Sequence, residues 1–130
     1  MNLIITFTLL ITGIIHLLPA VGVFGADRLQ VLYGMSVEDE SLALLMRHRA
    51  VLFALLGAFF VFAAFTPAYR SLAFVAGLVS VVSFLLLAEP WHTTGSVSVP
   101  AIQRVVQADV VALICLVLGG VVHMIQRTGE

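Results

Sequence analysis

Four long apolar stretches constrain what this chain can fold into. They cover residues 2–19, 44–65, 71–88 and 100–125, and each is close to the roughly 20 apolar residues that an α-helix needs to cross a bilayer. A soluble domain is about 45–50% apolar and about 25% charged, whereas this chain is 62% hydrophobic and 10% charged. In water, exposed apolar surface costs about 25 cal/mol per Å². The sequence therefore predicts an all-α integral membrane four-helix bundle that occupies residues 1–130 as a single domain.

The connection between the first two stretches predicts a further, short helix. Its middle, ADRLQVLYGM, mixes apolar with charged and polar residues, as an amphipathic helix on a membrane surface does. Beyond it, Ser36 and Asp39 have the spacing of a helix-capping box, and acidic residues here suit the positive end of a helix dipole. We therefore expect the second spanning helix to begin near Val37, before it enters the lipid.

Charge gives a preferred orientation and excludes one class of partner. Four spans put both chain ends on one side of the membrane, which carries Arg70 and Arg127. The opposite side has four arginines together with five acidic residues. The positive-inside rule then favours cytoplasmic termini. The net charge of −1 and the absence of lysine exclude the basic surface typical of nucleic-acid binding.

Most other ionisable residues are expected to gather toward the side opposite the termini. The first helix ends on that side, the second begins there, and so does the fourth. The bundle should be mostly apolar toward the termini. The predicted ligand-binding residues at the polar end are His16, Arg47, His48, Arg49, Arg104, Gln107 and Asp109.

Asp109 is the most informative of these residues because the apolar run VVALICLVLGGVV follows it. A central aspartate raises the free energy of helix insertion by about 2.5–3.5 kcal/mol, so such residues usually face the protein interior and have a partner. The topology makes Arg47 and Arg49 the nearest cations. Arg47 shares a helical stripe with the small residues Ala50 and Ala54, which favours Arg47 as the partner of Asp109.

Three classes of function fit this constellation. The first is a non-enzymatic membrane protein whose polar pocket binds a lipid head group or a quinone-like molecule, with arginines holding anionic or carbonyl oxygens. The second is a membrane oxidoreductase or isomerase that uses His16 and Asp109 for proton transfer. The third is a structural or accessory subunit, or a homo-oligomer, in which an Arg–Asp pair only fixes the helix register.

Metal and haem sites have weaker support. The chain has no H-E-x-x-H or C-x-x-C motif, and its single cysteine, Cys115, cannot form an internal disulfide. His16, His48 and His92 could converge with Glu89, but no two of them lie four residues apart on one helix. We predict no metal ion. Haem b between His16 and His48, or a bound quinone, remains an alternative cofactor.

Three segments resemble a group of small bacterial four-helix membrane proteins of unknown function that are broadly DoxX-like. The segments are LYGMSVEDESLALLMRHRAVLFALLGAFF, SLAFVAGLVSVVSFLLLAE and RVVQADVVALICLVLGG. The most specific parts, RHRAVLF and QAD, contain Arg47, His48, Arg49, Gln107 and Asp109. The resemblance implies a bacterial inner-membrane protein linked to quinone or thiol redox systems, and the single cysteine gives no support for a thiol role.

Overall fold

The described part of the chain is almost entirely helical. The computed structural model describes residues 2–33, 39–88 and 100–129, and within these ranges it contains no strand. The elements are α1 (Asn2–Leu17), the 3-10 helix η1 (Leu18–Phe24), α2 (Ala26–Tyr33), α3 (Glu40–Phe65), the 3-10 helix η2 (Pro67–Tyr69), α4 (Arg70–Ala88) and α5 (Pro100–Thr128).

Four helical segments are long and apolar enough to cross a membrane. They are Asn2–Phe24, Glu40–Phe65, Pro67–Ala88 and Gln103–Thr128. The predictions of an all-α chain and of four helices of spanning length are confirmed. By length and composition, the chain is an integral membrane protein.

The start of α3 differs from the expected position. The helix begins at Glu40 rather than near Val37, because Asp39 is its N-cap. The Asp39 carboxylate accepts a hydrogen bond from the Ser41 backbone N–H at 2.8 Å, which satisfies one of the donors that a helix N-terminus leaves without a partner. Ser36, the other member of the expected capping box, lies outside the described residues.

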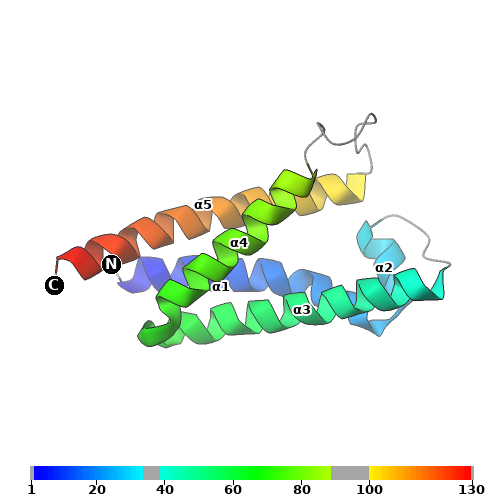
Figure 1. Ribbon diagram of the computed structural model, residues 1–130, viewed down its shortest axis with the longest axis horizontal. Helices are drawn as coiled ribbons and strands as arrows, with labels where there is room; N and C mark the ends of the chain where they lie inside the picture. Colours follow the sequence, from blue (N-terminus) through cyan, green and yellow to red (C-terminus); the bar gives the residue numbers. More distant parts are fainter. Residues whose placement is uncertain (1, 34–38, 89–99, 130) are drawn as a thin grey trace.

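Helix α1 lies between α3 and α5 and makes extensive contacts with both (Figure 1). Helix α4 runs obliquely in this view and packs mainly against α5 (Figure 1). Both chain ends lie at one end of the bundle, together with η2, as an even number of spans requires (Figure 1). We call this the terminal end. At the other end, the polar end, α3 and α5 begin and α2 lies beside η1.

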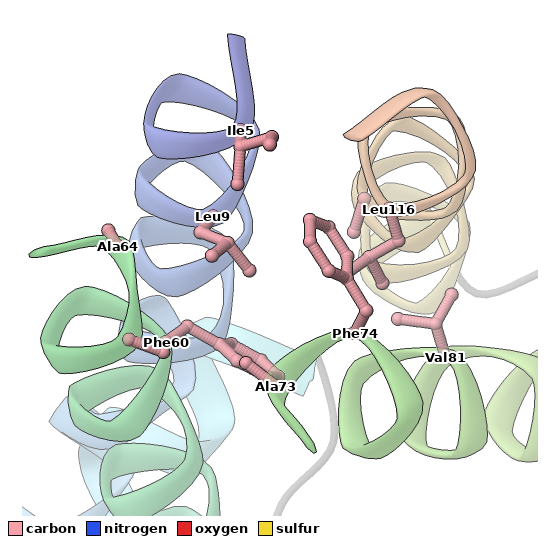
Figure 2. Close-up of a cluster of buried hydrophobic side chains, with 10 residues drawn as sticks. Ile5, Leu9, Phe60, Ala64, Ala73, Phe74, Val81 and Leu116 are labelled. Carbon is pink, nitrogen blue, oxygen red and sulfur yellow. The ribbon is translucent and has the colours of Figure 1, made fainter. Parts of the chain in front are cut away.

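The core combines large side chains with small ones at the helix crossings. Figure 2 shows Phe60 of α3 and Phe74 of α4 reaching into the space between the helices. Both rings are buried, and Phe60 is fully enclosed. Where α1 crosses α3, a Cβ atom added to Gly57 would lie 2.9 Å from the Gly13 carbonyl oxygen. Small residues permit this close approach, which holds membrane helices together by dispersion contacts.

Candidate functional site

A cavity of about 350 Å³ lies at the polar end of the bundle. Four of its lining residues are ionisable, and they come from three helices: His16 from α1, Arg49 from α3, and Arg104 and Asp109 from α5. The rest of the lining is apolar and includes Ile15, Leu18, Val31, Phe53, Val105 and Ala108. The cavity therefore joins an apolar wall to a small set of charged and hydrogen-bonding groups.

His16 is held in one orientation at this cavity. Its side chain is 1% exposed, and its Nδ1 atom lies 2.9 Å from the Thr12 carbonyl oxygen. A carbonyl oxygen only accepts hydrogen bonds, so Nδ1 carries a proton. In the neutral ring, Nε2 is then the acceptor, and the Ser80 hydroxyl lies 3.4 Å from it. The rings of Phe53 and Phe60 pack against the imidazole, with centroid distances of 5.6 and 5.0 Å.

Two of the three threonines of α1, Thr8 and Thr12, form hydrogen bonds within the helix itself. The Thr12 hydroxyl donates to the Thr8 carbonyl oxygen at 2.8 Å, and the Thr8 hydroxyl donates to the Ile5 carbonyl oxygen at 2.9 Å. Each hydroxyl proton is thus bound to a backbone oxygen of the same helix. These hydroxyls do not form a hydrogen-bonded chain from His16 toward the terminal end.

Asp109 and Arg49 face the same cavity. Asp109 is buried on α5, and the positive charge of Arg49 acts on its carboxylate. The Arg49 guanidinium also lies over two aromatic rings, 5.2 Å from the centroid of Phe53 and 5.6 Å from that of Phe84. Cation–π contacts of this kind orient the planar guanidinium and stabilise its charge away from water.

Arg47 points elsewhere, so the preference for Arg47 as the partner of Asp109 is wrong. Its side chain is exposed, and its Nε–H donates to the Val23 carbonyl oxygen at 3.1 Å. The reason is the position of Phe60 on the buried face of α3. Arg49 precedes Phe60 by eleven residues, which places the two only about 20° apart around a helix of 3.6 residues per turn. The buried face is therefore turned toward Arg49.

The other predicted site residues do not all meet at the cavity. Arg104 lines it although its side chain is exposed, whereas His48 and Gln107 are exposed and do not line it. Glu89 and His92 lie outside the described residues. A ligand-binding role for any of these side chains remains a prediction.

A neighbouring cavity of about 460 Å³ shares part of the same wall. Its lining includes Arg49 and Phe53 together with Ser80 and Phe84. Arg49 and Phe53 line both cavities and therefore lie between them. Sequence reasoning missed this feature because the position of Phe84 beside Arg49 depends on how α4 crosses the bundle.

The described residues give no metal centre. Within residues 2–33, 39–88 and 100–129, no group of three His, Cys, Asp or Glu side chains could hold an ion. His48 is exposed and does not line the cavity with His16, so the two rings do not face one another as haem ligands across it.

A second polar cluster, at the terminal end, was not expected. Arg70 is 7% exposed, and its guanidinium donates to Asn2 Oδ1 at 3.0 Å, to Thr6 Oγ1 at 3.2 Å and to the Ala64 carbonyl oxygen at 2.9 Å. The expectation of mostly apolar packing toward the termini is therefore incomplete. The sequence signal was the pair Asn2 and Thr6, which are four residues apart and share one face of α1.

Comparisons of this chain with models of protein families, with curated proteins and with solved structures found no match. Its function is therefore inferred from the cavity at the polar end and from the side chains that line it.

Proposed function

We propose that this chain is a non-enzymatic integral membrane protein that binds an amphipathic molecule in the cavity at the polar end. The ligand is a lipid head group or a quinone-like compound. One observation carries the proposal: a single cavity joins an apolar wall to His16, Arg49, Arg104 and Asp109. Small-molecule sites typically combine apolar walls with a few polar groups that fix the orientation of the ligand.

Each polar side chain has a distinct part in this proposal. The guanidinium groups of Arg49 and Arg104 donate hydrogen bonds to anionic or carbonyl oxygens of the ligand. Asp109 offsets part of their positive charge and orients Arg49. His16 contributes Nε2 only, since Nδ1 is bound to the Thr12 carbonyl oxygen. The apolar lining takes the ring or chain of the ligand.

The proposed setting is a bacterial inner membrane. Helix α2 would lie at the membrane surface as an amphipathic helix, because it combines the exposed charged residues Asp27 and Arg28 with Val31, an exposed apolar residue that borders the cavity. The four long helices would form a left-handed bundle, and Arg70 and Arg127 at the terminal end favour cytoplasmic termini. The resemblance to DoxX-like proteins supports a quinone as one of the two ligand classes.

The test is mass spectrometry of small molecules and lipids released from the protein purified from membranes in mild detergent. Arg49→Gln removes a cavity cation, and Arg28→Gln is the matched control because Arg28 is exposed on α2 and does not line the cavity. Loss of a charge-assisted hydrogen bond of about 1.5–3 kcal/mol weakens binding roughly ten- to hundredfold. We expect one compound near equimolar amount with the wild type and with Arg28→Gln, and little with Arg49→Gln.

The outcome also separates the two ligand classes. A quinone shows a characteristic ultraviolet difference spectrum on reduction, whereas a phospholipid contains phosphorus. The proposal is refuted if no compound is released in stoichiometric amount, or if Arg49→Gln retains it as well as Arg28→Gln does.

An enzyme that moves protons is the second candidate, because His16 and Asp109 line the same cavity. This candidate predicts that the released compound takes up deuterium from heavy water in the presence of the wild type but not of Asp109→Asn. Simple binding predicts no uptake with either protein. An accessory-subunit role predicts instead a larger complex in the native mass spectrum and no retained compound.

A further inference from the structure

A third cavity, of about 370 Å³, lies between α4 and α5 toward the terminal end. Its character changes along its length. Ser71 in the first turn of α4 and His123 and Arg127 near the end of α5 form its polar part. Farther from the terminal end its lining is apolar and includes Phe74, Leu78, Leu116, Val117, Gly120 and Val121. The cavity therefore has a polar mouth at the terminal end and an apolar groove that runs toward the middle of the membrane.

Hydrogen bonds link the polar residues at the mouth. Arg127 Nη1 donates to Ser71 Oγ at 3.2 Å, and Ser71 Oγ lies 2.9 Å from His123 Nε2. Because the Ser71 oxygen accepts from Arg127, its own proton is available for His123 Nε2. The Arg127 side chain is exposed, and this bond uses one of the five N–H donors that a guanidinium carries.

The described charged residues around this mouth are positive. Arg70 lies next to Ser71 in the chain, and its hydrogen bonds to described residues go to the neutral groups of Asn2, Thr6 and Ala64. The described acidic residues all belong to the polar end: Asp27, Asp39, Glu40 and Asp109. Within residues 2–33, 39–88 and 100–129, the terminal end therefore carries Arg70 and Arg127 with no carboxylate to balance them, and Glu130 lies outside these ranges.

We propose that this cavity binds one anionic phospholipid, with its phosphate against Arg127 and Ser71 and one acyl chain in the groove between α4 and α5. Charge complementarity selects an anionic head group, because the described charged residues at the mouth, Arg70 and Arg127, are cationic. The apolar groove selects a lipid over free phosphate, since inorganic phosphate would leave the groove unfilled. This site is separate from the cavity at the polar end and does not depend on the function proposed for that cavity.

Two variants distinguish a specific lipid site from nonspecific contact between an arginine and lipid head groups. Arginines at helix ends reach phosphates on any membrane surface, and that contact does not involve a groove. Arg127→Gln removes the charge at the mouth. Gly120→Leu fills the groove without touching the charge, because a Cβ atom at Gly120 has its nearest neighbours at 3.8 and 3.9 Å, both in the Phe74 ring.

The experiment is native mass spectrometry of the full chain, delipidated and then titrated with phosphatidylglycerol or with phosphatidylcholine of the same acyl chains. We expect one retained phosphatidylglycerol per wild-type chain. Arg127→Gln should weaken its binding about fivefold, the factor that corresponds to about 1 kcal/mol per arginine near anionic head groups. Gly120→Leu should weaken binding of both lipids, while Arg28→Gln, on the exposed surface of α2, should match the wild type.

Four results would overturn the proposal. Equal losses in Arg127→Gln and Arg28→Gln would mean general head-group contact, as would full binding by Gly120→Leu. Displacement of the lipid by millimolar inorganic phosphate would mean a free-anion site. A protein dimer that Gly120→Leu dissociates, without retained lipid in either form, would mean that a second copy of the chain fills the groove.

Discussion

Two adjacent glycines in α5, Gly119 and Gly120, should respond in opposite ways to the same substitution. A Cβ atom at Gly119 would overlap Thr8 Oγ1 and lie 2.9 Å from Thr8 Cβ and 3.0 Å from Phe74 Cε1. A Cβ atom at Gly120 would lie 3.8 Å from its nearest neighbour, Phe74 Cδ1, which is ordinary van der Waals contact. Gly119→Ala therefore tests how closely α1 approaches α5, and Gly120→Ala is its matched control.

The expected difference in unfolding free energy between the two variants follows from helix propensity and from packing. Replacing glycine by alanine inside a helix stabilises it by about 0.8–1 kcal/mol, and this gain is common to both variants. Overpacking a well-filled contact costs about 1–3 kcal/mol, and only Gly119→Ala incurs it because Thr8 Cβ is fixed to the α1 backbone. We expect Gly120→Ala to be as stable as the wild type or slightly more stable. Gly119→Ala should be less stable than Gly120→Ala by about 1–3 kcal/mol, the size of the overpacking term.

The assay is reversible unfolding in mixed micelles with increasing mole fraction of sodium dodecyl sulfate, followed by far-ultraviolet circular dichroism. Adding Thr8→Gly to Gly119→Ala removes both Thr8 atoms that the new methyl group meets, so the penalty of Gly119→Ala should shrink in the double variant. If Gly119→Ala proves as stable as Gly120→Ala, then α1 and α5 are not in the close contact that this reasoning requires.

Three further variants test other contacts. Arg70→Met keeps the apolar side-chain stem but loses three hydrogen bonds. We expect the free energy of unfolding to fall by at least about 1.5–3 kcal/mol, the usual value of one hydrogen bond to a charged group. An unchanged unfolding curve would contradict this. Gly57→Ala incurs an overpacking cost of about 1–3 kcal/mol, because its Cβ atom would lie 2.8 Å from Leu17 Cγ and 2.9 Å from a backbone oxygen of α1. After the gain of about 0.8–1 kcal/mol from alanine in a helix, we expect a net loss of up to about 2 kcal/mol. Ser80→Ala should cost less than about 1 kcal/mol because its contact with His16 is long, at 3.4 Å. In that variant, ¹⁵N NMR of His16 should still show the proton on Nδ1, and a proton on Nε2 would refute the assigned tautomer.

The sequence was sufficient for the number and nature of the long helices because one physical quantity sets them. The thickness of the hydrocarbon core fixes how many apolar residues a span needs, and this requirement can be counted along the chain. The burial of Asp109 followed from the same reasoning, since an ionisable group within an apolar run must face protein. The structure shows the Asp109 side chain 6% exposed on the cavity, where His16 is also buried, at 1% exposure.

The side-chain partners could not be predicted because they depend on how the helices are rotated and crossed. Arg49, rather than Arg47, lies on the same face of α3 as the buried Phe60. Phe60 is a large residue, so a stripe of small residues does not reveal this face. Arg70 lies just after a proline-containing turn and was counted only as a basic residue for orientation. Its burial requires Asn2 and Thr6 to face the start of α4, a relation between segments more than 60 residues apart.

The self-contained hydrogen bonds of Thr8 and Thr12 bear on how the protein is made. The ribosome synthesises α1 well before α4 and α5. Helix α1 is therefore exposed to the bilayer until the later helices pack around it. A polar group in hydrocarbon is costly unless it is satisfied, and both threonine hydroxyls are satisfied by carbonyl oxygens of α1 itself. Other polar groups of α1 have their partners in later segments: Thr6 donates to the Ala64 carbonyl oxygen of α3, Asn2 accepts from Arg70 of α4, and His16 Nε2 lies near Ser80 of α4. Helix α1 can therefore enter the membrane early, and the polar end is completed only when the second half of the chain has been synthesised.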